Sequence, residues 1–161
     1  MYKRVINYTN FNGEQKSKEC YFNLTRPEMM EMKRSPLFEM QAIIERIRSM
    51  EDPDNELTVE EKDMIQEKMG KILRDLVVMS YGEKSADGER FIKKVGADPF
   101  GKGQEFIETN AYDELYMEML QDIRGLIGFV RAVIPESLST QLDNDPELQR
   151  ELKELEASSI E

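Results

Sequence analysis

The sequence predicts a mainly α-helical protein, a helical bundle of about five to six helices with a small N-terminal β-hairpin. Between residues 25 and 135, apolar residues recur at intervals of three and four, which is the period of an amphipathic helix. The first 24 residues instead contain a turn signal and a two-residue alternation. We therefore expect a single domain made of a hairpin (1–24), a helical body (25–135) and an acidic C-terminal helix or tail (136–161).

The hairpin is predicted from the dipeptide Asn12-Gly13, which is typical of a type I′ turn because both residues tolerate positive φ. After the turn, Cys20, Phe22 and Leu24 are spaced by two residues and share one face. Because an isolated hairpin is marginally stable in water, this face is expected to rest on helices or on another copy of the chain. The unpaired edge of the hairpin makes self-association through strand pairing a further expectation.

Two capping boxes mark predicted helix starts, one at Thr25 with Glu28 and one at Thr58 with Glu61. The helix that follows Thr58 is the clearest element of the sequence and is expected to end at Tyr81. Its predicted buried stripe consists of Ile65, Met69, Ile72, Leu73, Leu76 and Val77.

The rest of the helical body is predicted from weaker signals. Residues 89–94 are expected to form a short helix and residues 96–103 a loop, because glycine and proline cluster in the second segment. Asn110 is expected to cap the next helix, with a break near Asp122. Apolar stripes also predict helices at 40–50 and 148–155.

The charge balance excludes two classes of partner. With 33 acidic and 22 basic residues, the chain has a net charge of −11, which repels nucleic-acid phosphates and anionic lipids. Residues 1–7 lack the apolar core of a secretory signal, and the apolar stretch 125–134 is too short to span a bilayer. A single cysteine suits a reducing compartment. We expect no nucleic-acid partner and no membrane partner.

The residues needed for catalysis or for binding a cofactor are not evident. The chain has no histidine, which removes the commonest general base and a common metal ligand. Asp52, Asp54 and Glu56 alternate as in a calcium loop, but Leu57 stands where that loop requires glycine. We therefore predict that the protein is not an enzyme and has no cofactor or metal.

Methionine is the unusual feature of the composition, with 11 residues. Its flexible, polarisable side chain packs against varied partner surfaces. Met69 and Met119 are expected to fill the core, whereas three methionines within four residues cannot all face one core. We predict partner contacts from this methionine group, Met29, Met30 and Met32, and from the exposed side of the helix expected after Asn110, at Tyr112 and Tyr116.

Four strings resemble tail assembly chaperones of long-tailed, siphovirus-like bacteriophages, and they occur in the order found in that family. They are YFNLTRPEM at 21–29, SYGEKSADGERF at 80–91, ETNAYDELYME at 108–118 and GFVRAVIP at 128–135. Residues 96–103 and the tail after Pro135 depart from the family pattern.

The resemblance implies a non-catalytic phage protein that works in the host cell cytoplasm and is absent from the finished virion. It would bind the tape measure protein, keep it soluble and help to recruit tail tube subunits around it. An alternative reading is a small acidic phage regulator that occupies a basic surface of a host factor, as the charge of −11 would allow. Steep weakening of binding with salt would favour this alternative.

Overall fold

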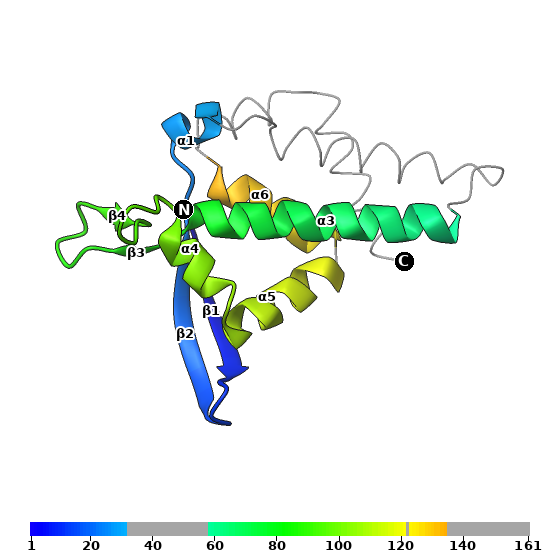
Figure 1. Ribbon diagram of the computed structural model, residues 1–161, viewed down its shortest axis with the longest axis horizontal. Helices are drawn as coiled ribbons and strands as arrows, with labels where there is room; N and C mark the ends of the chain where they lie inside the picture. Colours follow the sequence, from blue (N-terminus) through cyan, green and yellow to red (C-terminus); the bar gives the residue numbers. More distant parts are fainter. Residues whose placement is uncertain (32–57, 122, 135–161) are drawn as a thin grey trace.

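The computed structural model describes residues 1–31, 58–121 and 123–134, which form an antiparallel sheet with helices packed on it (Figure 1). In chain order the elements are β1 (Tyr2–Thr9), β2 (Gln15–Phe22), α1 (Arg26–Glu31), α3 (Val59–Ser80), β3 (Tyr81–Lys84), β4 (Phe91–Ile92), α4 (Gly101–Phe106), α5 (Asn110–Gln121) and α6 (Ile123–Val133). The fold is therefore mixed α/β, and the prediction of a mainly α-helical bundle is wrong.

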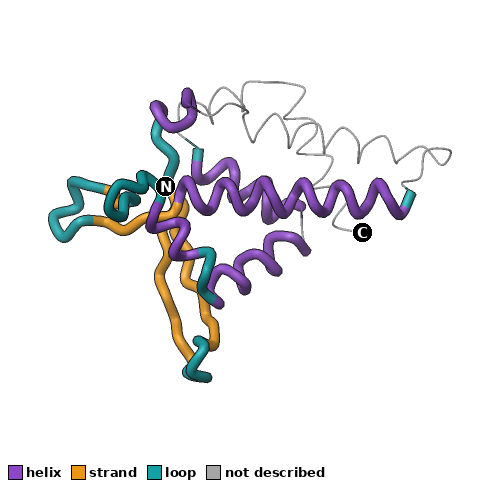
Figure 2. Tube along the Cα trace, in the orientation of Figure 1, coloured by secondary structure: helices purple, strands orange, loops and turns teal. Residues whose placement is uncertain are grey.

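The sheet has four strands in the order β1-β2-β3-β4, and all neighbouring strands are antiparallel. Figure 2 shows these strands gathered at the C-terminal end of α3. β3 has four residues and β4 has two, which is too few for a two-residue period to be recognised in the sequence. The short helix predicted at 89–94 is also wrong, because Phe91 and Ile92 pair with Lys84 and Glu83 across a turn.

The predicted N-terminal hairpin is present, but its turn is not of type I′. Of the two turn residues Asn12 and Gly13, only Gly13 adopts a positive φ, +80°, whereas a type I′ turn would require a positive φ at both. The side-chain oxygen of Asn10 accepts hydrogen bonds from the backbone N–H groups of Asn12 and Glu14. The Gly13 N–H donates to the Asn10 carbonyl, so the loop is the three-residue kind that ends in a left-handed glycine.

The core lies between the inner face of the sheet and the helices α3, α4, α5 and α6. The predicted inward face of β2 is confirmed, since Cys20, Phe22 and Leu24 are all buried. Phe22 is at the centre of an aromatic cluster. Its ring lies within 6.0 Å of four other rings, those of Tyr2, Tyr81, Phe106 and Phe129.

The predicted start and end of α3 are both confirmed. The Thr58 side chain accepts a hydrogen bond from the Glu61 N–H, and the Glu61 carboxylate accepts one from the Thr58 N–H. At the other end, Tyr81 is extended and leads directly into β3. The predicted stripe faces the core, with Ile65 half-buried and five residues buried, which are Met69, Ile72, Leu73, Leu76 and Val77.

The loop predicted at 96–103 is wrong at its C-terminal end, where α4 begins at Gly101. Gly103 lies against the backbone of α3, and a Cβ atom at this position would be 2.0 Å from the carbonyl oxygen of Val78. The glycine therefore permits two helices to approach closely. The sequence predicts a loop here because glycine and proline cluster in this segment, and that pattern does not reveal a close helix contact.

The break predicted near Asp122 is confirmed, since α5 and α6 are separate helices on either side of it. The start of α5 is also as predicted, but its capping residue is Thr109, whose hydroxyl accepts a hydrogen bond from the Tyr112 N–H at 3.4 Å. The Asn110 side chain instead donates to the Thr9 carbonyl at 2.8 Å. This bond ties the start of α5 to the end of β1.

Several predicted features lie outside the described residues, namely the helices at 40–50 and 148–155, the acidic loop at 52–56 and the tail at 136–161. The division into units at 1–24, 25–135 and 136–161 stays a prediction. No helix in the described ranges is both long and apolar enough to cross a bilayer.

Candidate functional site

Tyr112, one of the predicted partner-binding residues, is half-buried at the base of α5. Its ring meets that of Phe106 edge-on, with 6.2 Å between centroids, and lies 5.7 Å from the ring of Tyr116. Burial raises the pKa of the Tyr112 phenol to about 12, with a smaller contribution from Tyr116. The raised pKa reflects the packing of the ring, which holds α5 against α4.

Tyr116 connects α5 to α3. Gly70 is buried on α3, and a Cβ atom there would lie 2.4 Å from the Tyr116 hydroxyl oxygen. A larger residue at Gly70 would push the tyrosine away from α3. The contact sets the spacing of the two helices and leaves part of the Tyr116 ring at the surface between them.

The space between α3 and α5 is a groove of about 310 Å³, which we call the α3–α5 groove. Its acidic and amide groups come mainly from α3, and its apolar surface comes from α5. The lining residues are Asp63, Gln66, Glu67, Tyr116, Met117, Leu120 and Gln121.

Met117 is the most exposed apolar residue of this groove, with 51% of its surface accessible. It lies off the buried side of α5, which is formed by Ala111, Leu115 and Met119. An exposed, flexible methionine beside a half-buried tyrosine and leucine offers an apolar surface that can adapt to its partner.

The electrostatic character of the α3–α5 groove is negative. Neither Asp63 nor Glu67 forms an ion pair within the part of the chain that the structure describes. α5, which forms the opposite wall with Tyr116, Met117, Leu120 and Gln121, has no lysine or arginine to neutralise them. The groove therefore combines an apolar lining with uncompensated carboxylates.

A second groove, of about 380 Å³, lies where β1 meets α5 and α6. The guanidinium of Arg4 forms an ion pair with Glu118 and donates to the Tyr2 hydroxyl at 2.9 Å. The charges of this groove are therefore paired within the protein, unlike those of the α3–α5 groove. Its remaining lining residues are Met119, Gly125, Gly128 and Phe129.

The predicted methionine residues are only partly covered by the structure. Met29 lies on α1 and is half-buried against the core. The side chain of Met30 and the whole of Met32 lie outside the described residues. The core roles predicted for Met69 and Met119 are confirmed, since both are buried.

Sequence reasoning selected Tyr116 but missed the other lining residues of the α3–α5 groove. Met117 could have been found, because it is an apolar residue that stands off the apolar stripe of its own helix. Asp63 and Glu67 could not, because carboxylates are frequent in this sequence. Only the packing of α3 on α5 distinguishes these two from the rest.

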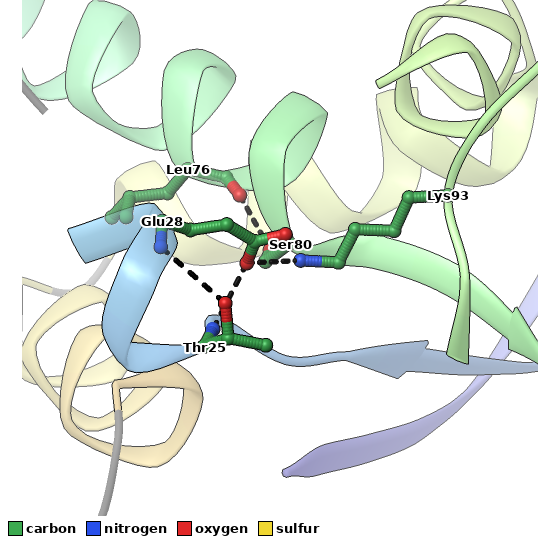
Figure 3. Close-up of polar contacts among 5 residues, drawn as sticks. All are labelled: Thr25, Glu28, Leu76, Ser80 and Lys93. Atoms are coloured by element: carbon green, nitrogen blue, oxygen red, sulfur yellow. Dashed lines mark hydrogen bonds and ion pairs between the residues drawn. The ribbon is translucent and has the colours of Figure 1, made fainter. Parts of the chain in front are cut away.

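Figure 3 shows a partly buried polar cluster, which joins α1 to the segment after β4. The Glu28 carboxylate accepts hydrogen bonds from the Thr25 N–H at 2.9 Å and from the Lys93 ammonium at 2.6 Å. Burial lowers the pKa of Lys93, and the hydrogen bond that Lys93 donates to Glu28 opposes this shift. Nearby, the Ser80 hydroxyl donates to the Leu76 carbonyl. These groups bond to one another, so the cluster is structural.

Cys20 is the single cysteine, and it is fully buried. Burial raises the pKa of its thiol to about 11, so the nucleophilic thiolate is scarce at neutral pH. Among the described residues, no group of three histidine, cysteine, aspartate or glutamate side chains is arranged to hold a metal ion.

An exposed, flexible methionine beside unpaired carboxylates is the kind of surface that binding proteins use to contact another protein. The family model described as "Phage tail assembly chaperone" matches residues 1–160, and the chain belongs to this family. The match confirms the resemblance carried by the four strings and extends through the tail that they do not reach. No curated protein and no solved structure matches the chain.

Proposed function

We propose that this chain binds the tape measure protein of its phage, keeps it soluble before assembly and helps to recruit tail tube subunits around it. It acts in the host cell cytoplasm and is not part of the mature virion. The observation that carries the proposal is the family membership, which spans nearly the whole chain. The net charge of −11 supports a role as a solubilising coat, because a strongly charged surface resists association.

The α3–α5 groove supports the proposal on physical grounds. An unassembled tape measure protein is expected to be a long helical chain whose apolar stripes are exposed to water. Helical segments bind other proteins by placing an apolar face in a groove. Methionine, tyrosine and leucine side chains line the groove and can adapt to several such segments.

The mode of binding follows from the need to remove the chaperone. Tube subunits must displace it, so each copy should bind weakly and many copies should bind one client. Weak contacts repeated along one chain give strong overall association that is still reversible copy by copy. Besides the groove residue Tyr116, we propose contacts from Tyr112 and from the region of Met29, Met30 and Met32.

Co-expression with the tape measure protein of the same genome tests the proposal. The amount of tape measure protein in the soluble fraction should rise, and the two proteins should co-purify. An unrelated acidic protein of similar size, expressed at the same level, is the control. A tape measure protein that stays equally insoluble and does not co-purify would contradict the proposed function.

The same complex distinguishes the proposal from the reading as an acidic regulator of a host factor. Apolar groove contacts should leave a residual affinity that salt does not remove, since salt screens only the flanking charges. Binding to a basic host surface would rest on exposed charge and would weaken steeply as salt is added. The comparison needs only a salt series on the purified complex.

A further inference from the structure

We infer that the α3–α5 groove takes a helical client segment whose apolar residues are flanked by lysine or arginine. This inference rests on the proposed function, because the client is taken to be the tape measure protein. It adds the place of contact and the chemistry of the segment that is recognised.

The size and lining of the α3–α5 groove suit part of a helix. A volume of about 310 Å³ is at the lower end of the range for pockets that enclose a small ligand. It accommodates a few side chains from one helical face. Tyr116, Met117 and Leu120 provide the apolar surface for those side chains.

The charges around the groove favour a basic segment. Asp63 and Glu67 are separated by one helical turn, and like charges at this spacing repel each other. A lysine or arginine placed between them would relieve that repulsion. Lys62, Lys68 and Lys71 also lie on α3, but none of them lines the groove.

Charge also argues against two other occupants. A second copy of this chain would bring a further net charge of −11 to an already negative surface. The C-terminal residues 136–161 contain eight acidic and two basic residues, so they too would meet the groove with like charge. A basic client is the occupant that complements it.

Charge reversal on the groove tests the inference. The double variant Asp63→Lys/Glu67→Lys should weaken binding of the purified tape measure protein by about tenfold or more, as loss of interfacial charge pairs does. The matched control is Glu89→Lys/Glu105→Lys, which makes the same change in net charge at two exposed positions outside the groove. The control should bind within about twofold of the unmodified chain, a change typical of distant surface charges.

An apolar substitution gives a second comparison that keeps the charge constant. Met117 and Met64 are 51% and 52% exposed, but only Met117 lines the groove. Met117→Ala should weaken binding several-fold, and Met64→Ala should not. Because both side chains are exposed, thermal unfolding of both variants should match that of the unmodified chain.

Synthetic peptides tiling the tape measure protein identify the segment. The tightest binders should carry lysine or arginine beside apolar residues at helical spacing. Replacing those basic residues with glutamate should abolish binding to the unmodified chain and restore it to Asp63→Lys/Glu67→Lys. A photo-crosslinker in place of Met117 should then capture the peptide.

The outcomes separate the inference from the proposed function. If the unmodified chain binds the tape measure protein and the groove variants bind like their controls, the inference is overturned and the proposed function stands. Crosslinks from position 117 to residues 32–57 or 136–161 that exclude the peptide would also overturn it. If the unmodified chain does not bind the tape measure protein, both the inference and the proposed function are contradicted.

Discussion

The carboxylate of Glu28 lies 2.6 Å from the ammonium group of Lys93, which follows 65 residues later in the chain. The Lys93 side chain is only 7% exposed, so the ion pair is largely shielded from water. Glu28 also accepts the Thr25 N–H and completes the capping box of α1. One carboxylate thus both caps α1 and fixes it to the segment after β4.

Glu28→Gln is therefore expected to destabilise the fold by about 2 kcal/mol. Removing one partner of a buried pair leaves the other charge uncompensated, and 21% exposure of Glu28 places the loss below that of a fully buried pair. Urea unfolding measures the change. In the double variant Glu28→Gln/Lys93→Met, the loss should be smaller than the sum of the two single losses. Additive losses would show that the two side chains are not coupled.

Alanine substitution at two helical glycines is expected to change the stability of the protein in opposite directions. At Gly103 a Cβ atom would meet the Val78 carbonyl at 2.0 Å, so Gly103→Ala should cost about 1–3 kcal/mol. At Gly128 a Cβ atom would meet no atom of the described residues within 4 Å, so Gly128→Ala should stabilise the protein by about 0.5–1 kcal/mol through helix propensity. Thermal unfolding of both variants tests the pair, and equal shifts would contradict the described packing of α4 on α3.

Cys20 should make stability depend on pH in the alkaline range. Burial raises the pKa of its thiol from 9.0 to about 11, so its contribution is fully present below pH 9 and is lost as pH rises toward 11. Cys20→Ala should remove this component and flatten the profile between these two values. Chemical denaturation across this range measures it. Rapid reaction of Cys20 with a thiol reagent in the native protein at neutral pH would contradict its burial.

The sequence predicts α3 well because local chemistry determines it. The capping box of Thr58 and Glu61 sets its start, and a long apolar stripe sets its buried face. By contrast, β3 depends on a pairing partner distant in sequence, as in Tyr21 with Gly82, and β4 is a two-residue strand that forms only by pairing with β3. A four-residue strand after a 22-residue helix has no periodic signal of its own.

The candidate site shows the same division between local and tertiary information. Tyr116 was selected as a bulky aromatic on a predicted helix, and it does line the α3–α5 groove. Its close approach to Gly70 and the meeting of Asp63 and Met117 in one groove follow from how α3 packs on α5. The sequence pattern of neither helix alone predicts that packing.

Truncation after Pro135 is expected to leave the body folded. The last described helix, α6, is already tied to the segment after β2 by the hydrogen bond from the Leu24 N–H to the Val133 carbonyl, at 2.9 Å. The melting temperature of the truncated chain should stay close to that of the full chain. A large loss of stability would show that residues 136–161 pack on the core.

The most direct test of the account is the amount of soluble tape measure protein recovered when it is co-expressed with three forms of this chain. The unmodified chain and the control Glu89→Lys/Glu105→Lys should keep the tape measure protein soluble and co-purify with it. Asp63→Lys/Glu67→Lys, folded to the same extent by circular dichroism, should leave it in the insoluble fraction. Equal recovery with all three forms would contradict binding through the α3–α5 groove, and no recovery with any of them would contradict the chaperone function itself.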